Sequence, residues 1–296
     1  GARGGPAMSA APLRATYRLQ LQPGFGFEAA AGAVPALAEL GISHLYLSPC
    51  FAARHGSTHG YDVVDYGRFS PALGSFGQFE ALVACLRTHG MGLILDLVPN
   101  HMGVMGSENR WWLDLMEHGR ASAHADYFDV DWTPLRQSLH GRVLVPVLGG
   151  PFGDILESGD LRLALAADAG GLRFEYHEHL FPLDPADYGT VLGATGDAGL
   201  AALGARFAAL PSRDEEDPAA RAERRTAAAA LKTRLAALCA EPQLRAAVEQ
   251  AVGALNGAPG DPGSFDALES LLARQAYRLS HWRVASDEIN YRRFFD

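Results

Sequence analysis

The chain has few cysteines and almost no lysine. Cys50, Cys85 and Cys239 are the three cysteines in 296 residues, and no two of them form a C-x-x-C pair. An odd and sparse set of this kind argues against a disulfide framework and indicates free thiols in a reducing cytoplasm. Lys232 is the only lysine, so arginine carries nearly all of the positive charge. We interpret this, with the many alanines, as genome composition rather than function.

Long apolar runs and excess positive charge are also lacking. No stretch of 18 uncharged apolar residues occurs, which argues against a membrane span, and residues 1–10 lack the apolar core of a secretory signal. The formal net charge of −9 argues against a general nucleic-acid or membrane-surface binder. At 48% hydrophobic and 20% charged residues, the chain can bury a core. We therefore expect a globular protein without a nucleic acid or membrane as partner.

The first hundred residues show a strand–helix rhythm. Apolar or alternating segments at residues 16–21, 42–47 and 92–98 predict strands. The segments at residues 27–40 and 75–89 end at glycines and predict the helices between them. Strand–helix–strand–helix–strand at this spacing indicates right-handed βαβ units and a parallel sheet. The stretch between the second strand and the second helix, residues 48–74, is rich in glycine and histidine and is predicted to be a loop.

The rhythm breaks after residue 101. The Ala-, Arg- and Leu-rich stretch at residues 219–240 predicts a long helix, and residues 256–263 form a turn-rich linker. A final helix is predicted at residues 265–281. We therefore divide the chain into residues 1–101 with the βα units, a mainly helical part at 102–263, and a C-terminal part at 264–296.

Two motifs fall where the predicted strands end. The segment 95–101, LDLVPNH, resembles the first signature region of the α-amylase superfamily, which lies at the end of barrel strand three. The segment 59–65, HGYDVVD, resembles the loop after strand two in the same superfamily. Each match alone is short, but both occur in the right order and at the right spacing.

Longer matches narrow the resemblance to one family. They lie at residues 16–21, 24–25, 40–49, 56–63, 99–103, 109–112, 277–279, 282–285 and 288–295, and they resemble the N-terminal part of maltooligosyltrehalose synthases. The resemblance covers nearly the whole chain and is weakest between residues 190 and 266.

This resemblance implies the fold and the reaction. The family has a TIM-type (β/α)8 barrel with its site at the C-terminal ends of the strands. We therefore expect an α/β fold, a partial barrel of three βα units at residues 1–101, with a large, mainly helical insertion subdomain at 102–263. A helix in 264–296 would then return to the barrel, and the chain would be truncated before strand four. The family converts the reducing-end α-1,4 bond of a maltooligosaccharide into an α,α-1,1 bond, without a cofactor.

The catalytic carboxyl groups are expected to be absent from this stretch. A retaining glycosidase-type reaction needs two carboxyl groups about 5 Å apart, one as nucleophile and one as acid/base. In the superfamily the nucleophile follows strand four within a G-x-R-x-D pattern. The nearest string, residues 171–175 (GLRFE), ends in glutamate and falls in the insertion, so we reject it.

Five residues are the candidates for the site, all assigned by the resemblance. Tyr61 resembles the tyrosine that stacks under the sugar, since an aromatic ring suits the apolar face of a pyranose. His101 resembles the histidine that hydrogen-bonds that sugar, and Asp96 the aspartate that orients an arginine beside the nucleophile. Asn100 matches a calcium-binding position of many amylases on which this family does not depend, and His59 is a further candidate sugar contact. No metal site is predicted.

Structural roles and other functions remain as alternatives. Without the resemblance, Asp96 would be interpreted as a loop cap or a buried ion-pair partner, Asn100 and His101 as the start of a turn, and Tyr61 as core packing. Within the same class, the rival function is another α-amylase-type hydrolase or glucanotransferase. From another class, the rival is a non-catalytic fragment that binds α-glucan or pairs with a second chain that completes the barrel.

Overall fold

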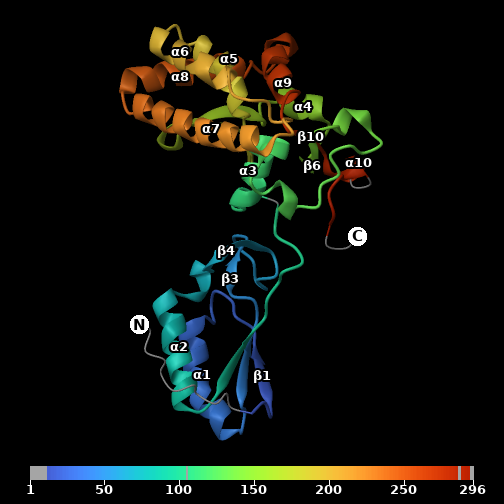
Figure 1. The fold of residues 1–296 in the computed structure, drawn as a ribbon. Coiled ribbons are helices and arrows are strands. Elements are labelled where there is room, and N and C mark those ends of the chain that lie inside the picture. Colours follow the sequence, from blue (N-terminus) through green and yellow to red (C-terminus); the bar gives the residue numbers. More distant parts are fainter. Residues whose placement is uncertain (1–11, 105, 286–287, 294–296) are drawn as a thin grey trace. The chain divides into compact units, whose positions relative to one another are not determined.

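The computed structural model describes residues 12–104, 106–285 and 288–293. The chain divides into two compact units, Gly1–Val104 and Met105–Asp296 (Figure 1). Each unit has its own sheets and helices and is described by itself. Among the described residues, no helix is long and apolar enough to cross a membrane.

The first unit is built on a parallel three-stranded sheet. Its strands β1 (Thr16–Leu19), β2 (His44–Leu47) and β5 (Gly92–Leu95) lie in the order β1-β2-β5. Both pairs, β1 with β2 and β2 with β5, are parallel. The helices α1 (Phe27–Glu39) and α2 (Phe76–Thr88) connect them. The βαβ rhythm predicted from the sequence is therefore confirmed.

Alternation along the strands decides which face of this sheet the helices cover. Leu45 and Leu47 of β2 are completely buried and pack in one core with Val34 of α1 and with Leu82 and Leu86 of α2. Tyr46, which lies between them in β2, points to the opposite face, because side chains alternate along a strand. Figure 1 shows α1 and α2 on the same side of the sheet.

The predicted loop at residues 48–74 is only partly a loop. It contains β3 (Phe51–Ala53) and β4 (Val63–Phe69), which form an antiparallel pair, and a 3-10 turn η1 (Pro71–Leu73). The pairing of β3 with β4 shifts register twice, so the segment lacks the clean alternation that identifies a strand. Phe51 stacks on Phe69, with ring centroids 5.7 Å apart, and this contact helps to hold the pair together.

The second unit mixes a parallel pair, an antiparallel sheet and helices. β6 (Val143–Leu148) pairs in parallel with β10 (Tyr277–His281). The strands β7 (Arg162–Ala166), β8 (Gly171–Tyr176) and β9 (His179–Pro182) form an antiparallel sheet. The α-helices are α3 (Arg110–His118), α4 (Phe152–Glu157), α5 (Tyr188–Gly193), α6 (Ala198–Ala208), α7 (Pro218–Cys239), α8 (Pro242–Leu255), α9 (Asp266–Leu272) and α10 (Trp282–Ala285). The 3-10 turns are η2 (Gly119–Ala121), η3 (Ala125–Tyr127), η4 (Gln137–Leu139), η5 (Ala167–Ala169), η6 (Pro185–Asp187) and η7 (Pro262–Phe265).

The C-terminal prediction needs a correction. The helix predicted at residues 265–281 ends at Leu272, and Tyr277–His281 is the strand β10. Tyr277 and Leu279 are buried while Arg278 between them is exposed, which is the alternation of a strand packed on one side. Because β10 pairs with β6, this strand of the C-terminal part lies in one sheet with a strand of the part predicted as a separate insertion. The prediction that this segment returns to a barrel stays a prediction.

A buried ion cluster links distant segments of the second unit. The Asp184 carboxylate accepts hydrogen bonds from Arg224, whose side chain is 1% exposed, and from Arg213 at 2.9 Å. The Asp184 main-chain N–H donates to Gln275 Oε1 at 2.8 Å. The end of β9, helix α7 and the segment after α9 are thereby joined around one carboxylate.

Candidate functional site

The predicted site residues lie in the first unit, on its strands and on the segments that follow them. Asp96 comes directly after β5, and its main-chain N–H continues the ladder by donating to the Leu47 carbonyl at 3.0 Å. Tyr61 lies between β3 and β4, on the excursion that follows β2. The C-terminal ends of parallel strands lie at the same edge of a sheet, and this brings segments distant in sequence together.

Tyr61 and Asp96 are in direct contact. The Tyr61 hydroxyl donates a hydrogen bond of 2.6 Å to Asp96 Oδ2 and accepts one of 3.2 Å from Arg18 Nη2. Arg18 Nη2 also lies 3.9 Å from Asp96 Oδ2. The three side chains therefore form a hydrogen-bonded series in which the Tyr61 phenol lies between the Arg18 guanidinium and the Asp96 carboxylate.

This arrangement changes the acidity of the phenol. The hydrogen bond to Asp96 is the main cause that raises the pKa of Tyr61 above its ordinary value, and partial burial raises it further. Arg18 acts in the opposite direction, because it donates to the phenol oxygen and favours the phenolate. The net result is a tyrosine that stays protonated, so that its hydroxyl remains a donor to Asp96.

Arg18 belongs to the face of the sheet that α1 and α2 leave uncovered. It pairs in register with Tyr46, which in turn pairs with Ile94. The leucines on either side of this row pack against the helices, so Arg18, Tyr46 and Ile94 point the other way. The Arg18 guanidinium lies over the Tyr46 ring at 5.6 Å from its centroid and also donates to Gln20 Oε1 at 3.0 Å.

The segment that carries Tyr61 is fixed by its own hydrogen bonds. Gly60 has φ +77°, and a Cβ there would lie 2.7 Å from the Pro49 carbonyl oxygen, so this position requires glycine. The Tyr61 main-chain N–H donates to His59 Nδ1 at 3.0 Å, which assigns the proton of a neutral His59 ring to Nε2. The His59 and Tyr61 rings are stacked, with centroids 6.0 Å apart.

The loop after Asp96 is tied to β4. The Tyr66 hydroxyl donates to the main-chain carbonyls of Val98 and of His101, the latter at 3.1 Å. The Gly103 N–H donates to the Val63 carbonyl at 2.8 Å. These bonds hold the backbone on both sides of Asn100, which is itself exposed, while His101 is partly buried.

The structure thus brings three of the five predicted residues together: Tyr61, Asp96 and His59. His101 and Asn100 follow on the same loop as Asp96, and their contact with a sugar stays a prediction. Tyr61 keeps 36% of its surface exposed, so the ring has a free area on which a ligand can stack. The Asp96 side chain is only 15% exposed and is already bonded to Tyr61, which suits an orienting role better than attack on a substrate.

Sequence reasoning missed Arg18. The available signal was the alternation in the segment TYRL, where Tyr17 and Leu19 fall on one face of the strand and Arg18 on the other. A charged residue on a face that the helices do not cover indicates a polar lining rather than a core. Its partners come from segments too distant in sequence for the pattern to predict.

The described residues offer no evident metal site. Across residues 12–104, 106–285 and 288–293, no group of three or more histidine, cysteine, aspartate or glutamate side chains is arranged to hold a metal ion.

Comparison with known proteins relates this chain to carbohydrate-active enzymes. Residues 33–147 match the family model described as the catalytic domain of alpha amylase. A Mycobacterium tuberculosis protein named as a maltooligosyl trehalose synthase is 43% identical over 173 residues, which is 54% of this chain and 22% of that protein. An intracellular maltogenic amylase of Bacillus subtilis is 35% identical over 106 residues, or 36% of this chain and 17% of that enzyme.

A solved structure extends the likeness over almost all of the chain. The maltooligosyltrehalose synthase from Arthrobacter ramosus aligns with 96% of this chain at 30% identity and a TM-score of 0.59. The chain covers only 26% of that structure, so it spans about a quarter of the length of such a relative. The likeness supports a fold of the α-amylase (β/α)8 family, in which strands and helices are mixed.

Proposed function

Because this chain resembles the maltooligosyl trehalose synthases, we propose that it is the N-terminal part of such an enzyme. The whole protein then carries out an intramolecular transglycosylation that turns the reducing-end α-1,4 bond of a maltooligosaccharide into an α,α-1,1 bond. The observation that carries this proposal is the likeness to these synthases, which extends in structure over nearly the whole chain, whereas the named amylase matches a smaller part.

We propose that the first unit supplies the first three βα units of the catalytic barrel. The support is its parallel sheet in the order β1-β2-β5 with a helical connection between successive strands. The second unit is then the insertion after the third barrel strand. This assignment concerns only the order of the elements along the chain. In this proposal the remaining barrel strands come from residues outside these 296.

Tyr61, Asp96 and His101 have supporting roles in this proposal. The exposed Tyr61 ring stacks under the sugar at the bond that is cleaved, and its bond to Asp96 sets the orientation of the ring. His101 hydrogen-bonds the same sugar and stabilises charge that develops in the transition state. Asn100 and His59 contact neighbouring parts of the substrate.

The covalent chemistry is assigned to groups outside this stretch. A nucleophilic carboxylate attacks the anomeric carbon, and an acid/base carboxyl protonates the leaving oxygen and later deprotonates the acceptor hydroxyl. Downstream residues or a second chain that completes the barrel would supply both groups. A cytoplasmic location fits the free thiols of Cys50, Cys85 and Cys239.

The test is reconstitution followed by a count of reducing ends. The chain is mixed with the complementary downstream part of a maltooligosyltrehalose synthase and incubated with maltopentaose. Conversion to an α,α-1,1 bond lowers the number of reducing ends, hydrolysis raises it, and transfer between chains leaves it unchanged. We expect a fall in reducing ends together with a non-reducing product of unchanged mass.

A matched pair of variants assigns that activity to the proposed site. His101→Ala should remove most of the reconstituted activity, whereas His89→Ala, in the helix C-cap after α2, should leave it unchanged. A rise in reducing ends would assign the chain to a hydrolase instead. Glucan binding without any change in reducing ends or in chain length would favour the non-catalytic alternative, whereas new chain lengths at a constant number of reducing ends would indicate a glucanotransferase.

A further inference from the structure

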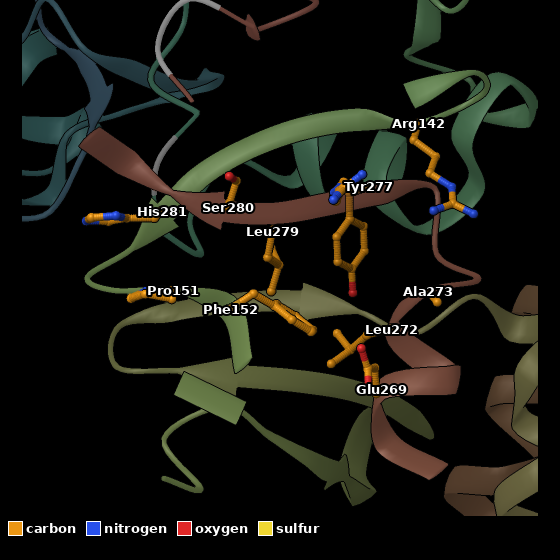
Figure 2. Close-up of a pocket in the computed structure, with 11 residues that line it drawn as sticks. Arg142, Pro151, Phe152, Glu269, Leu272, Ala273, Tyr277, Leu279, Ser280 and His281 are labelled. Carbon is orange, nitrogen blue, oxygen red and sulfur yellow. The ribbon is translucent and has the colours of Figure 1, made fainter. Parts of the chain in front are cut away.

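A cavity of about 420 Å³ lies within the second unit and takes no part in the proposed site. Its walls come from the start of β6, from α4, from α9 and from β10 (Figure 2). Phe152 of α4, Leu272 of α9 and Leu279 of β10 give it an apolar middle. A hollow of this size with an apolar wall and a few polar groups is typical of a small-molecule site.

One charged side chain at this cavity has no partner among the residues that the structure describes. Arg142 is partly buried, and among the residues that the structure describes its guanidinium makes no hydrogen bond or ion pair. A guanidinium has five N–H donors in a planar fork. Free donors of this kind at the wall of a cavity can bind a ligand with acceptor oxygens.

The charges around Arg142 favour an anionic ligand. Burial is the main cause that lowers its pKa, and the nearby Arg213 and Arg278 lower it further, against the opposite effect of Asp214. Arg213 is bonded to Asp184 at 2.9 Å, and Arg278 donates to Ser138 Oγ at 3.0 Å. Arg142 and Arg278 both line the cavity, and among the described residues neither forms an ion pair with a carboxylate, so a bound anion would be stabilised there.

The rest of the lining suits a hydroxylated ring rather than a second charge. Glu269 of α9 is exposed at the cavity, and its carboxylate makes no hydrogen bond or ion pair among the described residues. It can accept hydrogen bonds from ligand hydroxyls, and it disfavours a ligand with negative charge at both ends. Phe152 offers an aromatic ring on which the apolar face of a sugar can rest. Figure 2 shows Phe152 and Leu272 between Arg142 and Pro151 along the cavity.

We propose that this cavity binds a small hydroxylated anion of the sugar phosphate class, with its anionic oxygens on Arg142 and its ring against Phe152. Arginine forms paired charge-assisted hydrogen bonds with phosphate or carboxylate oxygens, which accounts for the orientation. The inference depends only on the second unit and is independent of the proposed transglycosylation.

Calorimetric titration of the whole chain tests this site, with glucose 6-phosphate, glucose and inorganic phosphate as probes. We expect saturable binding of glucose 6-phosphate, with glucose and phosphate each at least about tenfold weaker. Arg142→Met should weaken the binding of glucose 6-phosphate by at least about tenfold. The matched control is Arg234→Met on α7, which changes the same charge at an exposed position away from the cavity and should leave binding unchanged.

A thermal unfolding scan separates lost binding from lost structure. Since the Arg142 side chain forms no hydrogen bond or ion pair among the described residues, the Arg142→Met and Arg142→Gln variants should both unfold at a temperature no lower than that of the unchanged chain. The inference is overturned if glucose 6-phosphate shows no saturable binding, if it binds no tighter than phosphate, or if the Arg142 and Arg234 variants bind alike.

Discussion

The Tyr61 hydroxyl donates a 2.6 Å hydrogen bond to Asp96 Oδ2, across 35 positions of the chain. Tyr61 comes from the excursion after β2, and Asp96 from the first position after β5. The contact ties the segments after two neighbouring parallel strands to each other, and Arg18 of β1 adds a third strand to it. A tyrosine ring held in this way is oriented before a ligand arrives, which reduces the entropy that binding must overcome.

Two substitutions should shift the acidity of Tyr61 in opposite directions. Asp96→Asn removes the carboxylate that is the main cause of the raised pKa, so the pKa of Tyr61 should fall. Arg18→Met removes the group that favours the phenolate, so the pKa should rise further. NMR titration of chain labelled with carbon-13 in its tyrosine rings measures both shifts.

Arg14→Met is the control for the second substitution, because Arg14 is exposed and is not one of the groups that shift the pKa of Tyr61. Shifts of the same sign in Asp96→Asn and Arg18→Met would contradict the hydrogen-bonded chain through Tyr61.

The three thiols should differ in reactivity. Burial raises the pKa of Cys50 to about 11 and also raises the pKa of Cys239, and both side chains are buried. Since the thiolate is the reactive form, neither should react with a disulfide reagent at pH 8 in the folded chain. Cys85 is partly exposed and should react. A count of released chromophore should give about one thiol before unfolding and three after it.

The same shift predicts a loss of stability at high pH. Cys50 has a higher pKa in the folded chain than in the unfolded chain. Its contribution to the free energy of unfolding is therefore complete below about pH 9 and is lost as the pH rises toward 11. Cys50→Ala should weaken this pH dependence in denaturant unfolding. Cys85→Ser, at a position that is not buried, is the control and should leave the dependence as it was.

The buried carboxylate of Asp184 should be essential to the second unit. Asp184→Asn removes the negative charge that Arg224 and Arg213 share, and leaves a cation that is 1% exposed without its counter-charge. Breaking a buried pair by removing one partner costs about 3–5 kcal/mol. Urea unfolding should show a loss of that order, while Asp168→Asn, at a fully exposed side chain, should stay within about 0.5 kcal/mol. Equal effects of the two substitutions would show that the cluster does not stabilise the unit.

The sequence predicted the parallel sheet well because its signals are local. The apolar strands and the glycines after the helices both lie within short windows, and both are present in the structure. Asp96 and Tyr61 were assigned as site residues by the family resemblance, and that assignment stays a prediction. The sequence suggested that the two side chains lie near each other, but it did not predict the hydrogen bond between them.

What the sequence could not predict depends on pairing between distant segments. Tyr277–His281 is a strand because β6 lies beside it, more than a hundred positions earlier in the chain. In isolation, the segment continues a helical pattern. Arg18 was missed for a similar reason, since its partners Tyr61 and Asp96 come from other parts of the unit. Tertiary contacts outweighed the local preference in the first case and determine the partners of the residue in the second.

We predict that the 296-residue chain alone shows no measurable transglycosylation. The resemblance assigns the nucleophile and the acid/base to positions after this stretch, and loss of one such carboxylate already removes several orders of magnitude of rate. In the described residues, β1 and β5 are the edges of the first sheet, and unpaired edges favour association or aggregation over an ordered site. Tyr61 and His101 still permit weak glucan binding. The measurement is the loss of reducing ends from maltopentaose, which should stay at the level of a blank. A clear loss that His101→Ala abolishes would mean that the catalytic carboxylates lie within these residues after all.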